Sequence, residues 1–320
     1  MSKILITGGL GFIGHNVVKL LQDEHQVTVY DSLTNYGILN QTELDWLMKK
    51  REIGITGPVF TEDIRDRVKL ARVWAVANPD VVIHLASFPR AKVVNSDPVM
   101  GSDVMMTALM SMLTLAKESR TKRFVYVSSS MVYGDFQSGT TEFATCNPQG
   151  SYAIFKYAGE LLVKDFCKKN GMDYTIVRPS AVYGPLDVED RVVSKFLINA
   201  MRGQPLKING AGEVLDFTYV SDIAQGLSLA ATSENAANET FNVTRGAGHT
   251  LMRAALLAIS VTNSSSQLIM SDKDALFPSR GSLDVGKAKL LLNYEPKVDI
   301  EEGFKLYADW LYNDSIYWTR

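Results

Sequence analysis

The sequence contains few cysteines and histidines and no long apolar run. Two cysteines, Cys146 and Cys167, cannot staple a chain of 320 residues, so we expect reduced thiols in a cytoplasmic protein. The four histidines are scattered without zinc-ligand spacing, so we expect no metal site. No apolar run approaches the ~20 residues of a membrane span, and the chain opens on a strand pattern rather than a signal peptide. These absences argue against a secreted, membrane-bound or zinc-dependent protein.

An excess of charge of either sign is also lacking. The net charge is −2, so no general positive field exists to neutralise the phosphates of a nucleic acid. Hydrophobic residues make up 46% and charged residues 21% of the chain, which is the composition of a globular protein. We therefore expect no nucleic-acid partner, and any bound anion must be held by a few placed groups.

The first two-thirds of the chain alternates strand and helix patterns. The strands are short and rich in apolar residues, at 3–7, 26–30, 59–61, 80–85, 123–128 and 173–178. Helical patterns lie between them, at 12–22, 65–77, 98–119 and 152–169. Nearly continuous apolar strands separated by helices indicate a parallel sheet covered on both faces. The predicted fold class is therefore α/β, with a doubly wound parallel sheet of the Rossmann type.

After Pro179 the segments become shorter, and Gly, Pro and Asn interrupt them more often. We expect a dinucleotide-binding domain over residues 1–180 and a smaller α/β substrate lobe over residues 181–320. The strand pattern Thr240–Val243 indicates that the chain returns to the sheet within residues 214–245. A final helix is predicted from Ile300 to Tyr312.

A glycine-rich turn follows the first strand and opens the first helix. It holds Gly8, Gly11, Phe12, Ile13 and Gly14. The glycines let the backbone approach a pyrophosphate, and the helix N-terminus offers free N–H groups to that anion. Asp31 follows directly on the second strand, where an acid hydrogen-bonds the hydroxyls of an adenosine ribose and repels a 2′-phosphate. The sequence therefore predicts bound NAD rather than NADP.

Asp63 and Ile64 follow the third strand, at the same predicted edge of the sheet. We expect this pair to contact the adenine. The alternative for Asp63 is an ordinary N-cap of the helix that runs from Ile64 to Ala77.

A serine cluster follows the fifth strand, and a tyrosine and a lysine lie near the start of the next helix. Tyr152 and Lys156 are four residues apart, so both side chains lie on one helix face. The Lys156 ammonium and an oxidised nicotinamide both favour a phenolate, so we expect the pKa of Tyr152 to fall from about 10 toward working pH. Such a tyrosine takes a proton from a sugar hydroxyl, while a serine of the cluster 128–130 holds the same oxygen.

Together these motifs resemble the extended short-chain dehydrogenases/reductases, in particular the NAD-dependent nucleotide-sugar epimerase/dehydratase family with its UDP-sugar 4-epimerases. The resemblance covers nearly the whole chain. Its carriers are TGGLGFIG (7–14), Asp31, EDIRD (62–66), VIHLAS (82–87), FVYVSSSMVYG (124–134), YAIFK (152–156), RPSAVYGP (178–185), LDFTYVSDIA (215–224) and RGSLDVGKAKLLLNYEP (280–296).

The resemblance implies roles for individual residues. Tyr152 and Lys156 match the catalytic pair of the family, and Ser129 matches its catalytic Ser or Thr. Arg280 matches an arginine that meets the substrate diphosphate. The sugar would lie near Ser130 and Met131. Further cofactor contacts would come from Asn35, Leu85, Ala86 and Ser87.

Departures from the family pattern narrow the activity. Family dehydratases carry Asp-Glu, and decarboxylases a Glu, where this chain has Ser130 and Met131, so neither chemistry has its acid. Ala181 stands where many epimerases have a phosphate-binding Asn, and Leu215 where many have a diphosphate arginine. We hypothesise that Arg191, at the start of a helix, replaces that arginine; otherwise it is a solvated helix charge.

The sequence favours an NAD-dependent epimerase of a nucleoside-diphosphate sugar, acting at C4 through a transient keto sugar. A second interpretation is a keto-sugar reductase, which uses the same residues but exchanges its cofactor. Asp31 argues mildly against it because cellular reductions usually draw on NADPH. The same family's dehydratases and decarboxylases are disfavoured. A third interpretation is a non-catalytic dinucleotide sensor, which does not need Ser129, Tyr152 and Lys156 together.

The resemblance also implies a homodimer, in which the helices 98–119 and 152–169 of each chain form a four-helix contact. The first of these helices holds Met100, Met105, Met106, Met110 and Met112. We expect these methionines to pack in the core and between helices rather than to form an adaptable binding surface.

Overall fold

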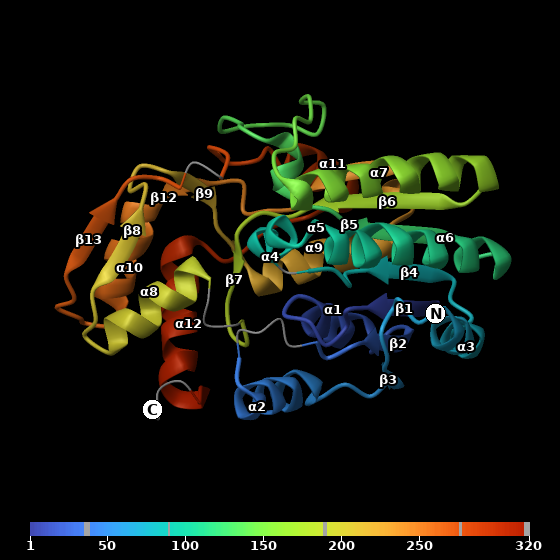
Figure 1. The fold of residues 1–320 in the computed structure, drawn as a ribbon, viewed down its shortest axis with the longest axis horizontal. Helices are drawn as coiled ribbons and strands as arrows, with labels where there is room; N and C mark the ends of the chain where they lie inside the picture. The colour runs from blue at the N-terminus through green and yellow to red at the C-terminus, as the bar shows by residue number, and fades with distance from the viewer. Residues whose placement is uncertain (35–38, 89, 188–190, 275–276, 317–320) are drawn as a thin grey trace.

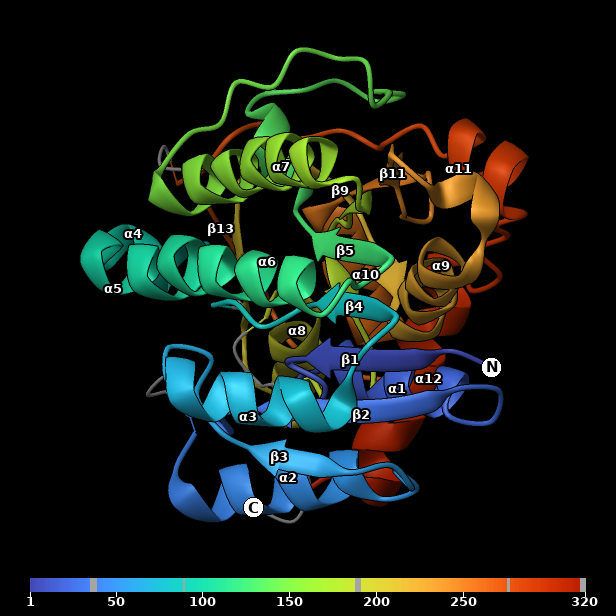
Figure 2. The same ribbon diagram turned by 90° about the vertical axis from the view of Figure 1, so that its right-hand side faces the viewer.

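The computed structural model describes residues 1–34, 39–88, 90–187, 191–274 and 277–316. A seven-stranded parallel sheet lies at its centre, with strand order β11-β6-β5-β4-β1-β2-β3 (Figures 1 and 2). The strands are β1 (Lys3–Thr7), β2 (Gln26–Asp31), β3 (Val59–Thr61), β4 (Val81–His84), β5 (Arg123–Val127), β6 (Asp173–Arg178) and β11 (Glu239–Asn242). The predicted fold class is confirmed, and β11 is the strand by which the chain returns to the sheet.

Helices cover both faces of the sheet, which is why its strands are apolar along their whole length. Ile4 and Ile6 of β1 pack toward α1 (Gly14–Leu21) and α9 (Val220–Thr232), whereas Leu5 faces the opposite side. That side is covered by α3 (Arg67–Ala77), α6 (Ala108–Glu118) and α7 (Ser151–Asn170). Successive side chains of a strand point to opposite faces, so the apolar residues of β1 serve two separate cores.

The predicted helix 98–119 is one helical stretch with an irregular centre. It consists of α5 (Pro98–Ser102), a π-helical turn (Asp103–Thr107) and α6. Contrary to the expectation from the sequence, the stretch Pro98–Glu118 is long and apolar enough to cross a membrane by length and composition. Met105 and Met112 are buried, Met112 against the sheet, as a core helix requires.

Other elements differ from expectation at their ends or were not expected. The first helix begins at Gly14 instead of 12, because the glycine turn occupies the preceding residues. An unpredicted helix, α2 (Gln41–Glu52), starts with a capping box in which Asn40 and Glu43 exchange side-chain to backbone hydrogen bonds. A short α4 (Ala91–Ser96) precedes α5.

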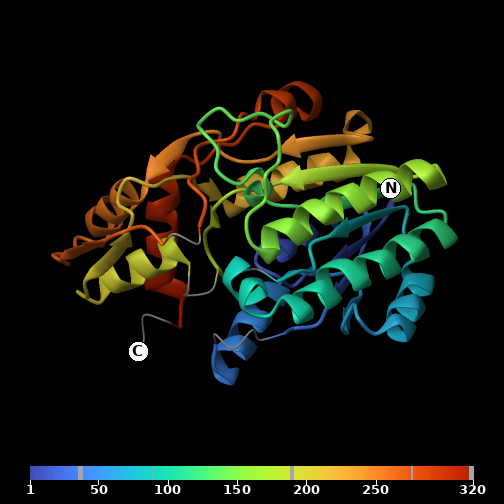
Figure 3. The ribbon, with the colours of Figure 1, turned by 45° about the horizontal axis from the view of Figure 1, so that its top comes forward.

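The remaining elements build a second layer of structure beside the sheet (Figure 3). Three two-stranded ladders pair β7 (Val182–Tyr183) with β10 (Thr218–Tyr219), β8 (Leu206–Asn209) with β13 (Leu268–Ser271), and β9 (Val214–Asp216) with β12 (Gly248–Thr250). The helices of this part are α8 (Val192–Met201), α10 (Leu251–Val261) and α12 (Ile300–Asp314), whereas α11 (Gly286–Leu292) packs against α9 and β11 on the sheet side. Because α9 and β11 belong to the sheet side, the chain passes between the two parts more than once. We retain the division at residue 180 only as a proposal.

Strand order reverses between β1 and β4, since β2 and β3 extend to one side of β1 and β5 and β6 to the other side of β4. In open parallel sheets, ligands bind beyond the carboxyl ends of the strands at such a switch point. The segments that follow β1, β2, β4 and β5 carry most of the residues singled out in the sequence.

Candidate active site

The glycine turn after β1 packs too closely for any side chain at two of its positions. Gly8 has φ +71°, and a Cβ there would lie 2.7 Å from the backbone nitrogen of Ala86. A Cβ at Gly14 would lie 2.1 Å from the carbonyl oxygen of Gly8. The helix α1 that follows has its N-cap at Ile13 without a side-chain cap. The backbone N–H groups of this turn are therefore the groups that an anion would meet.

Asp31 holds the glycine turn from the end of β2. Its carboxylate accepts hydrogen bonds from the backbone N–H of Leu10 and of Leu33, each at 2.9 Å. Burial raises the pKa of this carboxyl, while backbone hydrogen bonds and the Arg51 charge act in the opposite direction. A carboxylate has more acceptor positions than these hydrogen bonds use, so Asp31 can still accept from a ribose hydroxyl. The neighbouring Asn35 lies outside the described residues, so its predicted cofactor contact stays a prediction.

Arg51 of α2 supports the same turn and was not singled out in the sequence. It is buried, and it donates to the carbonyl oxygen of Leu10 at 3.2 Å and, from Nη2, to that of Leu186 at 2.7 Å. No sequence signal marks it, because a buried arginine in a helix is recognised only from the backbone carbonyls it meets.

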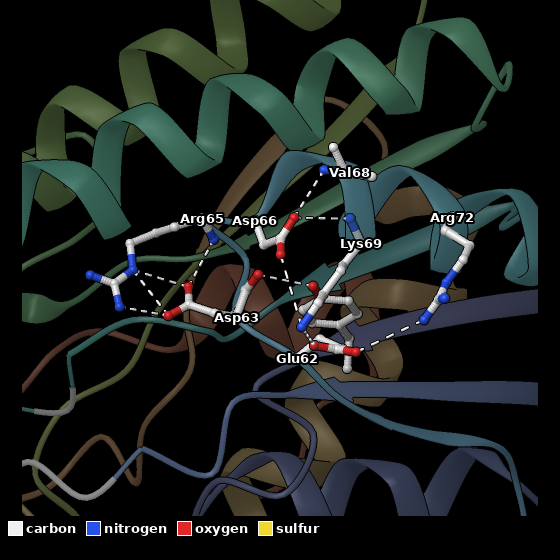
Figure 4. A network of polar contacts seen from close by, with 8 residues as sticks. Glu62, Asp63, Arg65, Asp66, Val68, Lys69 and Arg72 are labelled. Atoms are coloured by element: carbon white, nitrogen blue, oxygen red, sulfur yellow. Dashed lines mark hydrogen bonds and ion pairs between the residues drawn. The ribbon is translucent and has the colours of Figure 1, made fainter.

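Asp63 belongs to a surface network of charged residues after β3 (Figure 4). Its carboxylate binds the Arg65 guanidinium, with Nη2 at 2.6 Å from Oδ2, and these hydrogen bonds lower the pKa of Asp63. Asp66, not Asp63, is the N-cap of α3, since its carboxylate accepts from Val68 N and Lys69 N. The N-cap interpretation of Asp63 is therefore wrong. Ile64 is buried beneath this turn, and the adenine role of the pair stays a prediction.

Residues after β4 complete the cofactor side. Leu85 N donates to the carbonyl oxygen of Thr7 at 3.0 Å, so Leu85 and Ala86 lie directly beside the glycine turn. The hydroxyl oxygen of Ser87 is buried and has no hydrogen-bond partner within the described parts of the chain. A buried hydroxyl without a partner is costly unless a ligand supplies one. The glycine cradle and this hydroxyl fit a dinucleotide.

The structure brings Ser129, Tyr152 and Lys156 together. Ser129 follows β5 and begins a 3-10 turn, where its Oγ accepts from Met131 N at 3.2 Å. The Ser129 side chain lies near the Tyr152 hydroxyl, where it acts to lower the pKa of Tyr152. Lys156 Nζ lies 6.0 Å from the centre of the Tyr152 ring and donates to the carbonyl oxygen of Val127 at 2.8 Å. This hydrogen bond to β5 holds the Lys156 ammonium near the Tyr152 ring.

The predicted lowering of the Tyr152 pKa depends on Lys156 and an oxidised nicotinamide together, and it stays a prediction. Burial raises the pKa of Tyr152, and the forces that oppose it are the Arg191 charge and the contact with Ser129. Burial also lowers the pKa of Lys156 to about 7, so its charge is only partly present at neutral pH. The spacing in the sequence predicted that the two side chains lie close together, but it did not predict that both are buried.

A buried network behind the site was not predicted. Glu160 and Arg178 form an ion pair with Nη2 at 2.6 Å from Oε2, and both side chains are almost fully buried. Ser128 Oγ donates to the same carboxylate at 2.6 Å, and Arg178 Nη1 donates to the Tyr133 hydroxyl at 2.9 Å. The segment 128–134 that follows β5 is called the serine turn below. The network therefore links α7 and β6 to Ser128 and Tyr133, near the two ends of this turn.

The predicted substrate residues come from several separate segments of the chain. Ser130 and Met131 are buried, and Met131 packs with Ala91 and Ala153. Burial lowers the pKa of Arg280 to about 10, with Glu213 as the opposing negative charge. Arg191 forms an ion pair with Asp187 at 3.2 Å, and its guanidinium carbon lies 6.0 Å from the centre of the Phe12 ring. Arg191 is thus beside the glycine turn and Tyr152.

Among the described residues, no three His, Cys, Asp or Glu side chains gather so as to hold a metal ion.

Comparison with known proteins places this geometry in a family. Residues 4–244 match the model of the NAD dependent epimerase/dehydratase family. The chain belongs to this family. The resemblance seen in the motifs is thereby confirmed, and NAD is the family's cofactor, as Asp31 predicted.

Family members of different activities are similar to this chain to the same degree. An uncharacterized UDP-glucose epimerase of Bacillus subtilis is 29% identical over 94% of this chain and 95% of its own length. A UDP-glucuronic acid decarboxylase of Xenopus tropicalis is also 29% identical, over 94% of this chain and 70% of its own length. The crystal structure of a UDP-glucose 4-epimerase from Thermotoga maritima superposes with a TM-score of 0.86 at 28% identity, covering 96% of this chain and 98% of that one. The reaction must therefore be inferred from the site.

Proposed function

We propose that this family member is an epimerase of a nucleoside-diphosphate sugar and that it acts at C4. The observation that carries the proposal is the meeting of Ser129, Tyr152 and Lys156 beside the glycine turn, with Met131 as their apolar neighbour. This constellation is suited to moving a proton at a sugar hydroxyl. An apolar Met131 gives no acid or base for loss of water or of carbon dioxide.

The protein's own residues would move one proton out and back. When bound, NAD supplies the acceptor and then the donor of the hydride at the sugar carbon. Tyr152 takes the hydroxyl proton, and Ser129 donates a hydrogen bond to the same oxygen as it becomes a carbonyl. Lys156, held by the Val127 carbonyl, favours the phenolate form of Tyr152 whenever it is charged. Tyr152 returns the proton in the second half of the reaction.

The sugar must turn over between the two steps without leaving the site. Arg280 is our candidate for holding the diphosphate during this turn, and Arg191 is the candidate second cation. Binding energy from the nucleotide part, remote from the reacting carbon, keeps the keto sugar in place. Leu215 is an aliphatic, buried side chain, and it supplies no charge where many family epimerases have an arginine.

We also propose a homodimer in the cytoplasm. The helices α6 and α7 lie side by side on one face of the sheet (Figures 1 and 2), and α7 exposes Ile154 and Leu161. Apolar side chains on the outside of a helix pair suit a four-helix contact with a second copy. A monomer by light scattering would contradict this proposal.

The deciding experiment is incubation of the purified protein, without added cofactor, with UDP-, dTDP-, GDP- and CDP-sugars. Chromatography and mass measurement should give a new product of unchanged mass for one nucleotide. The variant Tyr152→Phe should give none while retaining its NAD. A loss of water or carbon dioxide would identify a dehydratase or decarboxylase, and a gain of two hydrogens on addition of NADH would identify a reductase. Bound NAD without turnover on any sugar would indicate a sensor.

A further inference from the structure

Arg280 lies on a segment that is hydrogen-bonded to the loop following the serine turn. Residues 135–140 of this loop, which we call the strap, run beside residues 279–284. On the side before Arg280, the Asp135 carboxylate accepts from Ser279 N at 2.6 Å, and Phe136 N donates to Ser279 O at 3.0 Å. Both backbone groups of Ser279 are therefore bound by the strap.

The side after Arg280 is bound in the same way. Gly139 N donates to Ser282 O at 2.9 Å, and Ser138 Oγ accepts from Ser282 N at 3.2 Å. Thr140 and Leu283 then form a parallel β-bridge. With anchors on both sides, the backbone of Arg280 has little freedom to move relative to the strap.

Gly281 makes this close pairing possible. A Cβ at this position would lie 2.2 Å from Ser138 N and 2.4 Å from Gln137 C. Both are backbone atoms, so the strap or the Arg280 segment would have to move to admit a side chain. The opposite side of the segment is also fixed, because the buried Asp216 carboxylate accepts from Leu283 N at 3.0 Å.

The strap connects the two ends at which one substrate would be held. It begins directly after the turn Ser129–Gly134, which the buried Glu160–Arg178 pair holds against the sheet. It ends at the segment that carries Arg280. The spacing between the reacting hydroxyl and the diphosphate is therefore set within the protein by one short, doubly anchored stretch of chain.

We propose that the strap positions Arg280 relative to Ser129, and that Gly281 is a positioning residue for binding the diphosphate. This inference rests on the function proposed above. A displacement of about 1 Å is enough to lose a charge-assisted contact of this kind.

The test measures binding of UDP, dTDP, GDP and CDP by calorimetry to the full-length protein with its NAD bound. We expect Gly281→Ala to weaken binding of the preferred diphosphate about tenfold without loss of NAD. Arg280→Ala should weaken it to a similar extent, and the double variant no further, since both changes remove one contact. The matched control is Gly212→Ala, where an added Cβ meets nothing within 4 Å.

A second variant removes the anchor without adding atoms. Asp135→Ala should also weaken diphosphate binding, whereas Asp165→Ala, which removes an exposed carboxylate of α7, should not. Unchanged affinity in both Gly281→Ala and Asp135→Ala, or losses that add to that of Arg280→Ala, would overturn the role of the strap alone. Failure of the wild-type protein to bind any of the four diphosphates would overturn the proposed function and this inference with it.

Discussion

At the scale of the residue, the reactive side chains are held where their charged forms are disfavoured. Burial raises the pKa of Tyr152 and lowers that of Lys156 to about 7. The pKa of Tyr152 is therefore not set by Lys156 alone, nor that of Lys156 by Tyr152 alone. The positive charge that acts on Tyr152 comes from Arg191, on a different element from both of them. Arg191 therefore favours the phenolate form of Tyr152 in the proposed proton transfer.

The variant Arg191→Ala tests this charge. Removing the cation favours the neutral phenol, so the pKa of Tyr152 should rise and the acidic limb of the kcat–pH profile should move to higher pH. If Arg191 also contacts the diphosphate, KM should rise about tenfold. Steady-state kinetics with the preferred nucleotide sugar across pH measure both effects.

Arg191→Lys is the control, because it keeps a positive charge but loses the planar guanidinium. It should preserve the position of the pH limb and show only the KM effect. A pH profile unchanged in Arg191→Ala would contradict the electrostatic role, and an unchanged KM would contradict the role at the diphosphate.

At the scale of the element, a buried ion pair fixes α7 against β6. Glu160 follows Lys156 by one helical turn, so the carboxylate bound to Arg178 lies on the same face of α7 as the lysine. The same carboxylate accepts from Ser128 at the end of β5. The pair therefore fixes the registration of α7 relative to the serine turn.

The variant Glu160→Gln leaves Arg178 buried without its counter-charge. We expect the free energy of unfolding to fall by about 3–5 kcal/mol, because the desolvation of the arginine is no longer offset. Urea unfolding at neutral pH measures this change. Asp165→Asn is the matched control on the same helix: it breaks the exposed pair with Lys169 and should cost about 0.5 kcal/mol or less. Equal losses in the two variants would show that burial of the pair is immaterial.

At the scale of the whole molecule, two buried histidines couple folding to pH. His15 contacts the carbonyl oxygen of Gly11 at 2.9 Å, and His84 contacts Thr7 Oγ1 at 2.7 Å. Burial lowers the pKa of both to about 3, against about 6.5 in an unfolded chain. Their contribution to stability is fully present above pH 6.5 and is lost as the pH falls toward 3, since the unfolded chain then binds more protons.

We therefore expect acid to destabilise the protein well above the pKa of ordinary carboxylates. Between pH 7 and pH 5, each histidine should reduce the free energy of unfolding by roughly 2 kcal/mol. Asp216 acts in the opposite direction, because burial raises its pKa to about 6. The measurement is urea unfolding at both pH values for the wild type and His84→Gln. The variant should lose about 2 kcal/mol less than the wild type, and parallel losses would contradict the assignment.

Much of the fold followed from local patterns. The glycine turn, the apolar strands and the Tyr152–Lys156 spacing depend on residues close in sequence, and each formed where the sequence placed it. The sequence did not predict contacts between residues that are far apart along the chain. Arg51 meets the carbonyl of Leu186, and Glu160 meets Arg178, and neither pairing leaves a periodic signal. The alternative that Asp63 caps a helix is wrong because Asp66, three residues later, takes that position.

Local patterns were enough to predict the sheet, the dinucleotide turn with its acid, and the identity of the reactive side chains, because backbone propensity and hydrophobic period are local properties. The charge state of those side chains and the contacts that hold them depend on the folded chain. Burial opposes the expected shift of the Tyr152 pKa, and the strap ties Arg280 to residues more than one hundred positions earlier. Desolvation and backbone contact depend on what the rest of the chain places nearby, and one stretch of sequence does not contain that information.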